Sequence, residues 1–122
     1  MSTVNLTADT FEQTVRSNDI VLVDFWAAWC GPCRMFAPVY DKASSAHPDI
    51  VFGKVDTEAE RVLAAQADIT SIPTLMVFRE SVLVFRQPGA LPAAALDELI
   101  GAVRALDMDD VRARVAAKQP VS

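Results

Sequence analysis

The chain has 122 residues, of which 52% are hydrophobic, and its formal net charge at pH 7 is -5. This length predicts one domain with a real hydrophobic core. The acidic balance argues against nucleic acid and anionic membrane surfaces as partners. The sequence contains no apolar stretch of transmembrane length, and its first residues lack the basic start and apolar run of a signal peptide. We therefore expect a cytoplasmic protein, in a compartment where thiols are kept reduced.

The first part of the chain alternates strand and helix patterns. Residues 3–6 predict a short edge strand, and a helix is predicted over about residues 8–16. The apolar run over residues 20–26 predicts a central strand that is buried on both faces. Asp24 breaks this pattern, because a carboxylate inside a buried strand is costly. From the residues alone, an aspartate at a strand end facing water is equally consistent.

A pentapeptide with the sequence Trp-Cys-Gly-Pro-Cys occupies residues 29–33, just before a helix predicted to end near residue 46. The first amides of a helix lack intrahelical partners, and the helix dipole adds partial positive charge there. A thiolate is stabilised at such a position, so the pKa of the Cys30 thiol should fall and its reactivity should rise. Cys33 lies one turn further on the same face, close enough to form a disulfide with Cys30.

The Cys-x-x-Cys spacing also occurs in zinc sites and in structural disulfides. A structural zinc ion needs about four ligands, and beyond the two cysteines this chain offers one histidine, His47, in a predicted loop. A structural disulfide that closes so short a loop removes little entropy from the unfolded chain. Redox chemistry is the use that requires two cysteines, this spacing and this position.

The middle of the chain repeats the strand and helix alternation. Residues 50–55 predict a second buried strand. The four residues from Thr57 to Glu60 have the form of a capping box, which predicts a helix that reaches about residue 67. Pro73 then precedes another strand, and the residues alone favour an ordinary trans peptide bond before it.

The next part of the chain predicts a hairpin and a helix. Strands over residues 74–79 and 82–87 are joined by the pair Glu80-Ser81, which lacks the Asn-Gly signal of a two-residue turn and leaves the turn type open. A helix over about residues 93–106 follows. Strands that alternate with helices predict parallel pairing, and the hairpin adds an antiparallel pair. The sheet should therefore be mixed, with helices on both faces.

Residues 107–122 depart from this pattern. They begin with an acidic stretch, and their apolar residues are mostly alanine and valine, too few to bury. Residues 111–118 predict at most one or two turns of helix. We predict one domain over residues 1–106 and a flexible C-terminal tail without a catalytic role, the alternative being a tail that binds a partner.

Three segments of the chain together resemble the thioredoxin family. They are the pentapeptide at residues 29–33, the Val-Asp-Phe-Trp sequence before it, and the sequence Ser-Ile-Pro-Thr at residues 71–74. The resemblance covers roughly residues 3–106. It implies an α/β thioredoxin fold, with a central mixed sheet of about five strands flanked by four helices. It also implies a thiol–disulfide oxidoreductase that reduces protein disulfides through a reversible dithiol–disulfide pair.

The resemblance implies a role for each of four residues. Cys30 is expected to be the nucleophile and Cys33 the resolving thiol. Asp24 is expected to be a buried proton acceptor below the second cysteine, with a pKa that burial raises. Lys54, in the neighbouring strand, resembles the family's lysine near that aspartate, and the alternative is an ordinary edge-facing lysine.

The resemblance also implies a cis peptide bond before Pro73 and a flat apolar surface around Cys30. An extended segment of a protein substrate would add backbone hydrogen bonds at this surface. The residues expected to form it are Trp29, Gly31, Pro32, Ile72, Pro73, Gly89 and Ala90.

By resemblance, the protein binds no cofactor and receives electrons from NADPH through thioredoxin reductase. Its partners would be that reductase and disulfide-containing protein substrates, and we expect a monomer. The Gly31-Pro32 pair lacks the histidine of oxidising relatives, which favours reduction. Two alternatives remain open. One is a disulfide isomerase or oxidase in an oxidising compartment, which would need a signal sequence, and the other is a non-catalytic module that binds partners through the apolar surface.

Overall fold

The computed structural model describes residues 2–118, so residues 119–122 of the predicted tail lie outside it. Its strands are β1 (Thr3–Asn5), β2 (Ile20–Trp26), β3 (Val51–Asp56), β4 (Thr74–Arg79) and β5 (Val82–Pro88). Its helices are α1 (Phe11–Ser17), α2 (Gly31–Ala46), α3 (Arg61–Gln66), α4 (Ala93–Arg104) and α5 (Met108–Lys118). None of the helices within this range is long and apolar enough to cross a membrane.

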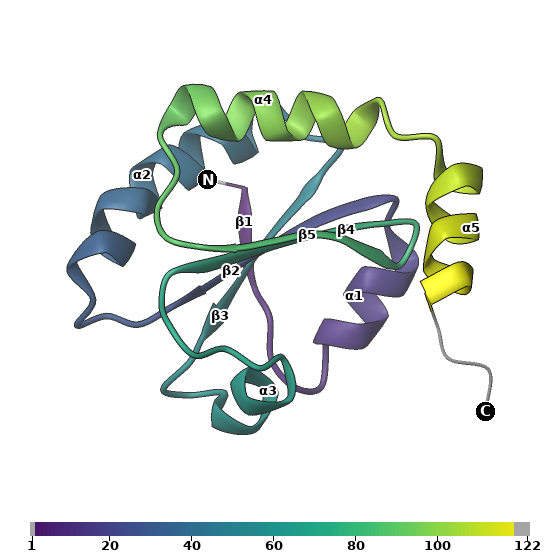
Figure 1. Cartoon of the computed structure of the whole chain (residues 1–122). Coiled ribbons are helices and arrows are strands. Elements are labelled where there is room, and N and C mark those ends of the chain that lie inside the picture. The colour runs from purple at the N-terminus through teal and green to yellow at the C-terminus, as the bar shows by residue number, and fades with distance from the viewer. Residues whose placement is uncertain (1, 119–122) are drawn as a thin grey trace.

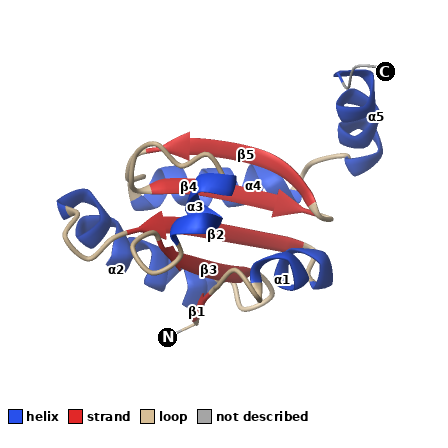
Figure 2. Cartoon of the chain, turned by 90° about the horizontal axis from the view of Figure 1, so that it is seen from below, coloured by secondary structure: helices blue, strands red, loops and turns tan. Residues whose placement is uncertain are grey.

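The strands form one mixed sheet in the order β1-β3-β2-β4-β5. β3 pairs in parallel with β1 and β2, whereas β4 is antiparallel to both β2 and β5. Helices α2 and α4 cover one face, and α1 and α3 cover the other (Figure 1, Figure 2). The predicted fold class is confirmed, and it places β2 at the centre of the sheet with the pentapeptide directly after its carboxyl end.

Side chains of β2 alternate between two cores, because successive residues of a strand point to opposite faces. Ile20 and Leu22 pack in the core that α2 and α4 cover. Val23 and Phe25 pack in the core that α1 and α3 cover. Asp24 has the same parity as Ile20 and Leu22, so it lies on the face of β2 that α2 covers.

The capping box predicted from Thr57 to Glu60 does not form. The Thr57 hydroxyl donates instead to the carbonyl oxygen of Trp26 at 3.0 Å, and a carboxylate oxygen of Glu60 accepts from the amide of Ala8 at 2.8 Å. As a result α3 begins only at Arg61, without a side-chain cap. Both side chains bind segments that are distant in sequence, and the amides of Glu58 and Ala59 donate instead to the carboxylate of Asp56, at 2.9 and 3.3 Å.

The β4–β5 turn has left-handed backbone at both of its central residues. The φ angles are +49° at Glu80 and +68° at Ser81, which is the pattern of a type I′ turn. The usual Asn-Gly pair is absent, and contacts from outside the hairpin hold the turn instead. The amide of Glu80 donates to the carbonyl oxygen of Asp19 at 2.7 Å, and its carboxylate lies 2.6 Å from the guanidinium of Arg112.

The segment after residue 107 forms α5, where the sequence predicts a flexible tail with at most a turn or two of helix. Met108 at its start is buried, and Arg112 reaches the carboxylate of Glu80. Arg79 donates to the carbonyl oxygen of Leu106 at 2.9 Å, just before α5. These contacts tie α5 to the hairpin and to the end of α4 (Figure 1). The low apolar content of this segment does not reveal the attachment, because one buried methionine and two arginines make it.

We expect deletion of residues 107–122 to lower the free energy of unfolding by about 1–3 kcal/mol, mainly because the apolar side chain of Met108 loses its burial. Urea titrations of the full chain and the truncated chain measure this difference. Met108→Ala in the full chain is the matched variant and should account for most of the loss. Equal midpoints for the full and truncated chains would show that α5 does not stabilise the domain.

Candidate active site

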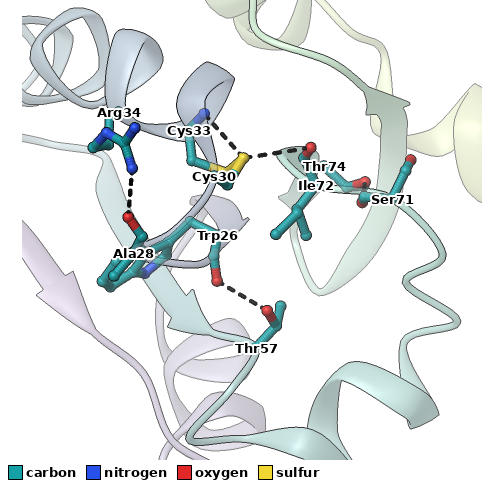
Figure 3. Close-up of a disulfide and its surroundings, with 9 residues drawn as sticks. All are labelled: Trp26, Ala28, Cys30, Cys33, Arg34, Thr57, Ser71, Ile72 and Thr74. Carbon is teal, nitrogen blue, oxygen red and sulfur yellow. Dashed lines mark hydrogen bonds between the residues drawn. A yellow bond between two sulfur atoms is a disulfide. The ribbon is translucent and has the colours of Figure 1, made fainter.

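Cys30 and Cys33 form a disulfide where the carboxyl end of β2 meets the amino end of α2 (Figure 3). Their Cα atoms lie 5.2 Å apart. Cys30 is the N-cap residue of α2, and its sulfur accepts a hydrogen bond from the amide of Cys33 at 3.2 Å. This amide and the positive end of the helix would stabilise negative charge on the Cys30 sulfur after reduction. The structure therefore puts the cysteine pair at the predicted helix start.

The disulfide is reached through a groove. Cys30 is 4% exposed and Cys33 is 3% exposed. A groove of about 600 Å³ has Cys30 in its lining. Trp29, which also lines the groove, is 66% exposed. A molecule that fills the groove would thus contact Cys30 and the exposed Trp29 at the same time.

The predicted docking surface is only partly assembled at this groove. The four predicted residues in its lining are Trp29, Gly31, Pro32 and Ile72. Pro73 is buried, and its carbonyl oxygen accepts from the amide of Gly89 at 2.7 Å. Gly89 and Ala90 are exposed but do not belong to the lining.

Much of the groove comes from α3 and the segments on either side of it, which the sequence analysis missed. Residues of this part include Thr57, Glu58, Arg61, Ala64, Ile69 and Thr70. The amide and the hydroxyl of Thr57 both donate to the carbonyl oxygen of Trp26, at 2.9 and 3.0 Å, which ties this segment to the end of β2 (Figure 3). No local pattern marks these residues, because they reach the cysteines only through the parallel pairing of β2 with β3.

The peptide bond between Ile72 and Pro73 is cis, as the resemblance implies. The Ile72 side chain packs against the cysteine pair. Its carbonyl oxygen lies 3.7 Å from the Cys30 sulfur (Figure 3). In the disulfide this is a van der Waals contact, and after reduction a Cys30 thiol at the same place can donate to that oxygen.

Arg34 is a further residue of this region that the sequence analysis did not single out. Its guanidinium donates to the carbonyl oxygen of Ala28 at 2.8 Å (Figure 3). The bond joins the second turn of α2 to the loop between β2 and the pentapeptide. It therefore restrains the loop that carries Trp29.

Asp24 is buried, with 1% of its surface exposed. This burial raises the pKa of Asp24 from 3.8 to about 7, and the nearby Lys54 ammonium opposes part of the rise. Lys54 is opposite Asp24 in the register of β2 and β3, and its Nζ lies 4.9 Å from the centroid of the Trp26 ring. Because β3 lies between β1 and β2, Lys54 is not on an edge strand. A carboxyl group with a pKa near neutrality can both accept and release a proton at neutral pH.

The geometry opposes a zinc site at the cysteines. His47 is the C-cap residue of α2, so it is separated from Cys30 by the whole helix, about 24 Å. Its Nδ1 lies 3.1 Å from a guanidinium nitrogen of Arg104, which in turn pairs with Asp49. Across residues 2–118, no histidine, cysteine, aspartate and glutamate side chains gather in a group that could hold a metal ion.

Comparison with known proteins agrees with this geometry. The thioredoxin family model matches residues 2–102. A Streptomyces coelicolor protein provisionally named thioredoxin 2 is 63% identical over 118 residues, which cover 97% of this chain and 88% of that protein. A thioredoxin of Porphyra purpurea is 43% identical over 102 residues, covering 82% of this chain and 95% of that protein. A solved structure of Plasmodium falciparum thioredoxin superposes with a TM-score of 0.74 at 35% identity, covering 80% of this chain and 96% of that chain. The chain therefore belongs to the thioredoxin family, whose members are protein thiol–disulfide oxidoreductases.

Proposed function

We propose that this protein reduces disulfides in other proteins, with Cys30 as the nucleophile and Cys33 as the resolving thiol. The observation that carries the proposal is the Cys30–Cys33 disulfide at the start of α2, beside a groove that is lined by Cys30. Of the two cysteines, only Cys30 lines the groove, and its sulfur accepts the helix amide, which supports its role as the attacking residue. Cys33 has neither property, which suits a thiol that acts second.

The reaction moves two electrons from the dithiol to the target. The Cys30 thiolate attacks one sulfur of the target disulfide, a mixed disulfide forms, and the other target sulfur leaves as a thiolate that takes up a proton. The Cys33 thiolate then attacks the Cys30 sulfur and forms the Cys30–Cys33 disulfide. The second target sulfur leaves in its turn as a thiolate, so the target gains two thiols and the protein loses two.

Cys33 must lose its proton before it attacks, and we propose that the carboxylate of Asp24 accepts this proton. Three features support the assignment: Asp24 lies on the face of β2 that α2 covers, it is buried, and its pKa is raised to about 7. The ammonium of Lys54 lowers that pKa relative to burial alone, so a useful fraction of the carboxylate is ionised at neutral pH. We therefore propose that Lys54 adjusts the pKa of the acceptor, Asp24.

The groove is proposed to hold an extended segment of the target around its disulfide. Trp29, Pro32 and Ile72 supply apolar contacts next to the Cys30 sulfur. Backbone groups of the segment that contains Pro73 would pair with the target as an added strand does. Gly89 and Ala90 lie beside this segment, since the Gly89 amide donates to Pro73, and we place them at the border of the docking surface together with Gly31.

The oxidised protein must be reduced again before the next cycle. We propose that thioredoxin reductase supplies the two electrons from NADPH, so that this chain needs no cofactor of its own. A disulfide that must return to the dithiol suits a reducing compartment such as the cytoplasm. The redox pair Cys30–Cys33 lies within one chain, so the proposed reaction needs no second copy and we propose a monomer as the active form.

Reduction of insulin with dithiothreitol as the electron source tests the proposal against a non-catalytic binding module. We expect the purified protein to accelerate precipitation of the released insulin chains, measured by light scattering. The variant with both Cys30→Ser and Cys33→Ser should give no rate above that of dithiothreitol alone. If the double variant is as fast as the natural chain, the cysteines are not the catalysts and the apolar surface serves another role.

A further inference from the structure

Met35 is the most exposed large apolar side chain within residues 2–118, at 75% of its surface. The other two methionines of this range, Met76 and Met108, are only 4% and 5% exposed. A thioether reacts with a dissolved oxidant only where the oxidant can reach the sulfur. The fold therefore separates one reactive methionine of the domain from two protected ones.

Met35 lies next to the groove on the surface of α2. It follows Pro32 by three residues, and residues i and i+3 are neighbours on one face of a helix. Pro32 itself lines the groove together with Trp29 and Cys30. Pro32 and Met35 are both exposed, so the apolar rim of the groove continues along α2 as far as Met35.

We propose that Met35 is an oxidation site that controls docking of protein substrates, because its sulfoxide weakens their contact with the rim of the groove. The inference rests on the proposed function, since it requires that substrates dock at this groove. An unbranched thioether adapts to many apolar surfaces. Its sulfoxide is polar and chiral, so covering it with an apolar part of a substrate costs desolvation.

The oxidant is a peroxide, of which hydrogen peroxide is the simplest. A lone pair of the Met35 sulfur attacks one peroxide oxygen, a sulfur–oxygen bond forms and the oxygen–oxygen bond breaks. The sulfur is oxidised by two electrons, and the departing hydroxide takes the proton of the transferred oxygen and leaves as water. Methionine sulfoxide reductases return the sulfoxide to the thioether, so the modification is reversible.

The first experiment locates the oxidation. The full chain in its disulfide form, in which both cysteines are protected, is treated with hydrogen peroxide and digested, and its peptides are followed by mass spectrometry. We expect the peptide with Met35 to gain one oxygen atom well before the peptides with Met76 and Met108. Oxidation of either buried methionine at the same rate as Met35 would overturn the proposal.

The second experiment measures docking. After peroxide treatment, we expect kcat/KM for insulin to fall by about tenfold, the lower end of what the loss of one apolar contact costs. The rate with cystine, a disulfide too small to reach the rim, should not change. Met35→Leu has no sulfur at this position, so its rate on insulin after the same treatment should equal its own rate before treatment, and any fall would report oxidation elsewhere.

Two results would contradict this inference while leaving the proposed function intact. One is an equal fall in the rates with insulin and with cystine, which would place the effect on the cysteines. The other is an equal fall in the Met35→Leu variant, which would place it on another residue. If the untreated chain reduces neither disulfide, the proposed function fails, and this inference fails with it.

Discussion

Replacing Cys33 by serine is expected to trap this protein on its targets. Cys30 still lies at the N-cap of α2 and lines the groove, so the first attack remains possible. The resolving thiol is missing, so the mixed disulfide between Cys30 and the target accumulates after one turnover. With NADPH and thioredoxin reductase as the electron source in place of dithiothreitol, steady-state reduction of insulin should fall by roughly a thousandfold or more, the scale seen when a residue of a covalent mechanism is lost.

Gel electrophoresis without reductant measures the trapped complex. The Cys33→Ser variant should show a covalent adduct with a disulfide-containing protein, and dithiothreitol should release it. Cys30→Ser is the matched control, because it keeps one thiol but removes the thiol of the cysteine that lines the groove. An adduct with Cys30→Ser and none with Cys33→Ser would reverse the two roles.

At pH 8, the Asp24→Ala variant is expected to be more stable than the natural chain. Burial raises the pKa of Asp24 from 3.8 to about 7, so between these values the folded protein holds a proton that the unfolded chain has released. The stability of the natural chain therefore falls as pH rises through this window, and above it the full cost of the buried charge remains. One pKa unit is worth about 1.4 kcal/mol, so this carboxyl should cost the natural chain about 2–3 kcal/mol between pH 5 and pH 8.

Alanine removes this charge and leaves a small cavity, so we expect a gain on the order of 1–3 kcal/mol at pH 8. At pH 5 the gain should largely disappear. Denaturant titrations of both oxidised proteins at the two pH values measure the difference. Asp24→Asn, which keeps the shape of the side chain, separates the charge from the cavity, and Asp9→Asn is a control at an exposed aspartate. A difference between Asp24→Ala and the natural chain that does not change with pH would show that Asp24 is solvated.

Asp24→Ala should also resolve mixed disulfides more slowly, because the Cys33 proton has lost its acceptor. Rapid mixing of the reduced protein with a disulfide substrate separates the first attack, which should keep its rate, from the resolving step. If Asp24→Ala is stabilised at pH 8 but resolves mixed disulfides at the natural rate, Asp24 is buried in the natural chain but is not the proton acceptor.

Local pattern determined the elements that carry the chemistry. The largely apolar run from residue 20 to residue 26 became β2 with the predicted bounds, because an apolar run of this length suits a strand that is buried on both faces. The three-residue spacing of Cys30 and Cys33 placed both sulfurs on one turn at the start of α2. The hairpin after Pro73 also followed from its residues, because both strands and their two-residue connection lie in one short stretch of chain.

The sequence identified Asp24 as unusual, but only the tertiary structure decided its state. A carboxylate in a strand is costly when buried and harmless when solvated, and the packing of α2 over β2 settles which of these applies. The same limit applies to Thr57 and Glu60, whose side chains can cap a helix and instead bind distant segments of backbone.

Local sequence patterns could not predict the groove or α5, for a related reason. The groove is completed by residues of α3 that reach Cys30 only because β3 pairs with β2. α5 depends on Met108, which is buried only in the folded domain, and on Arg112, which meets Glu80 only after the hairpin has closed. Periodicity and spacing report contacts between neighbours in sequence, whereas these features depend on contacts that exist only once the sheet has formed.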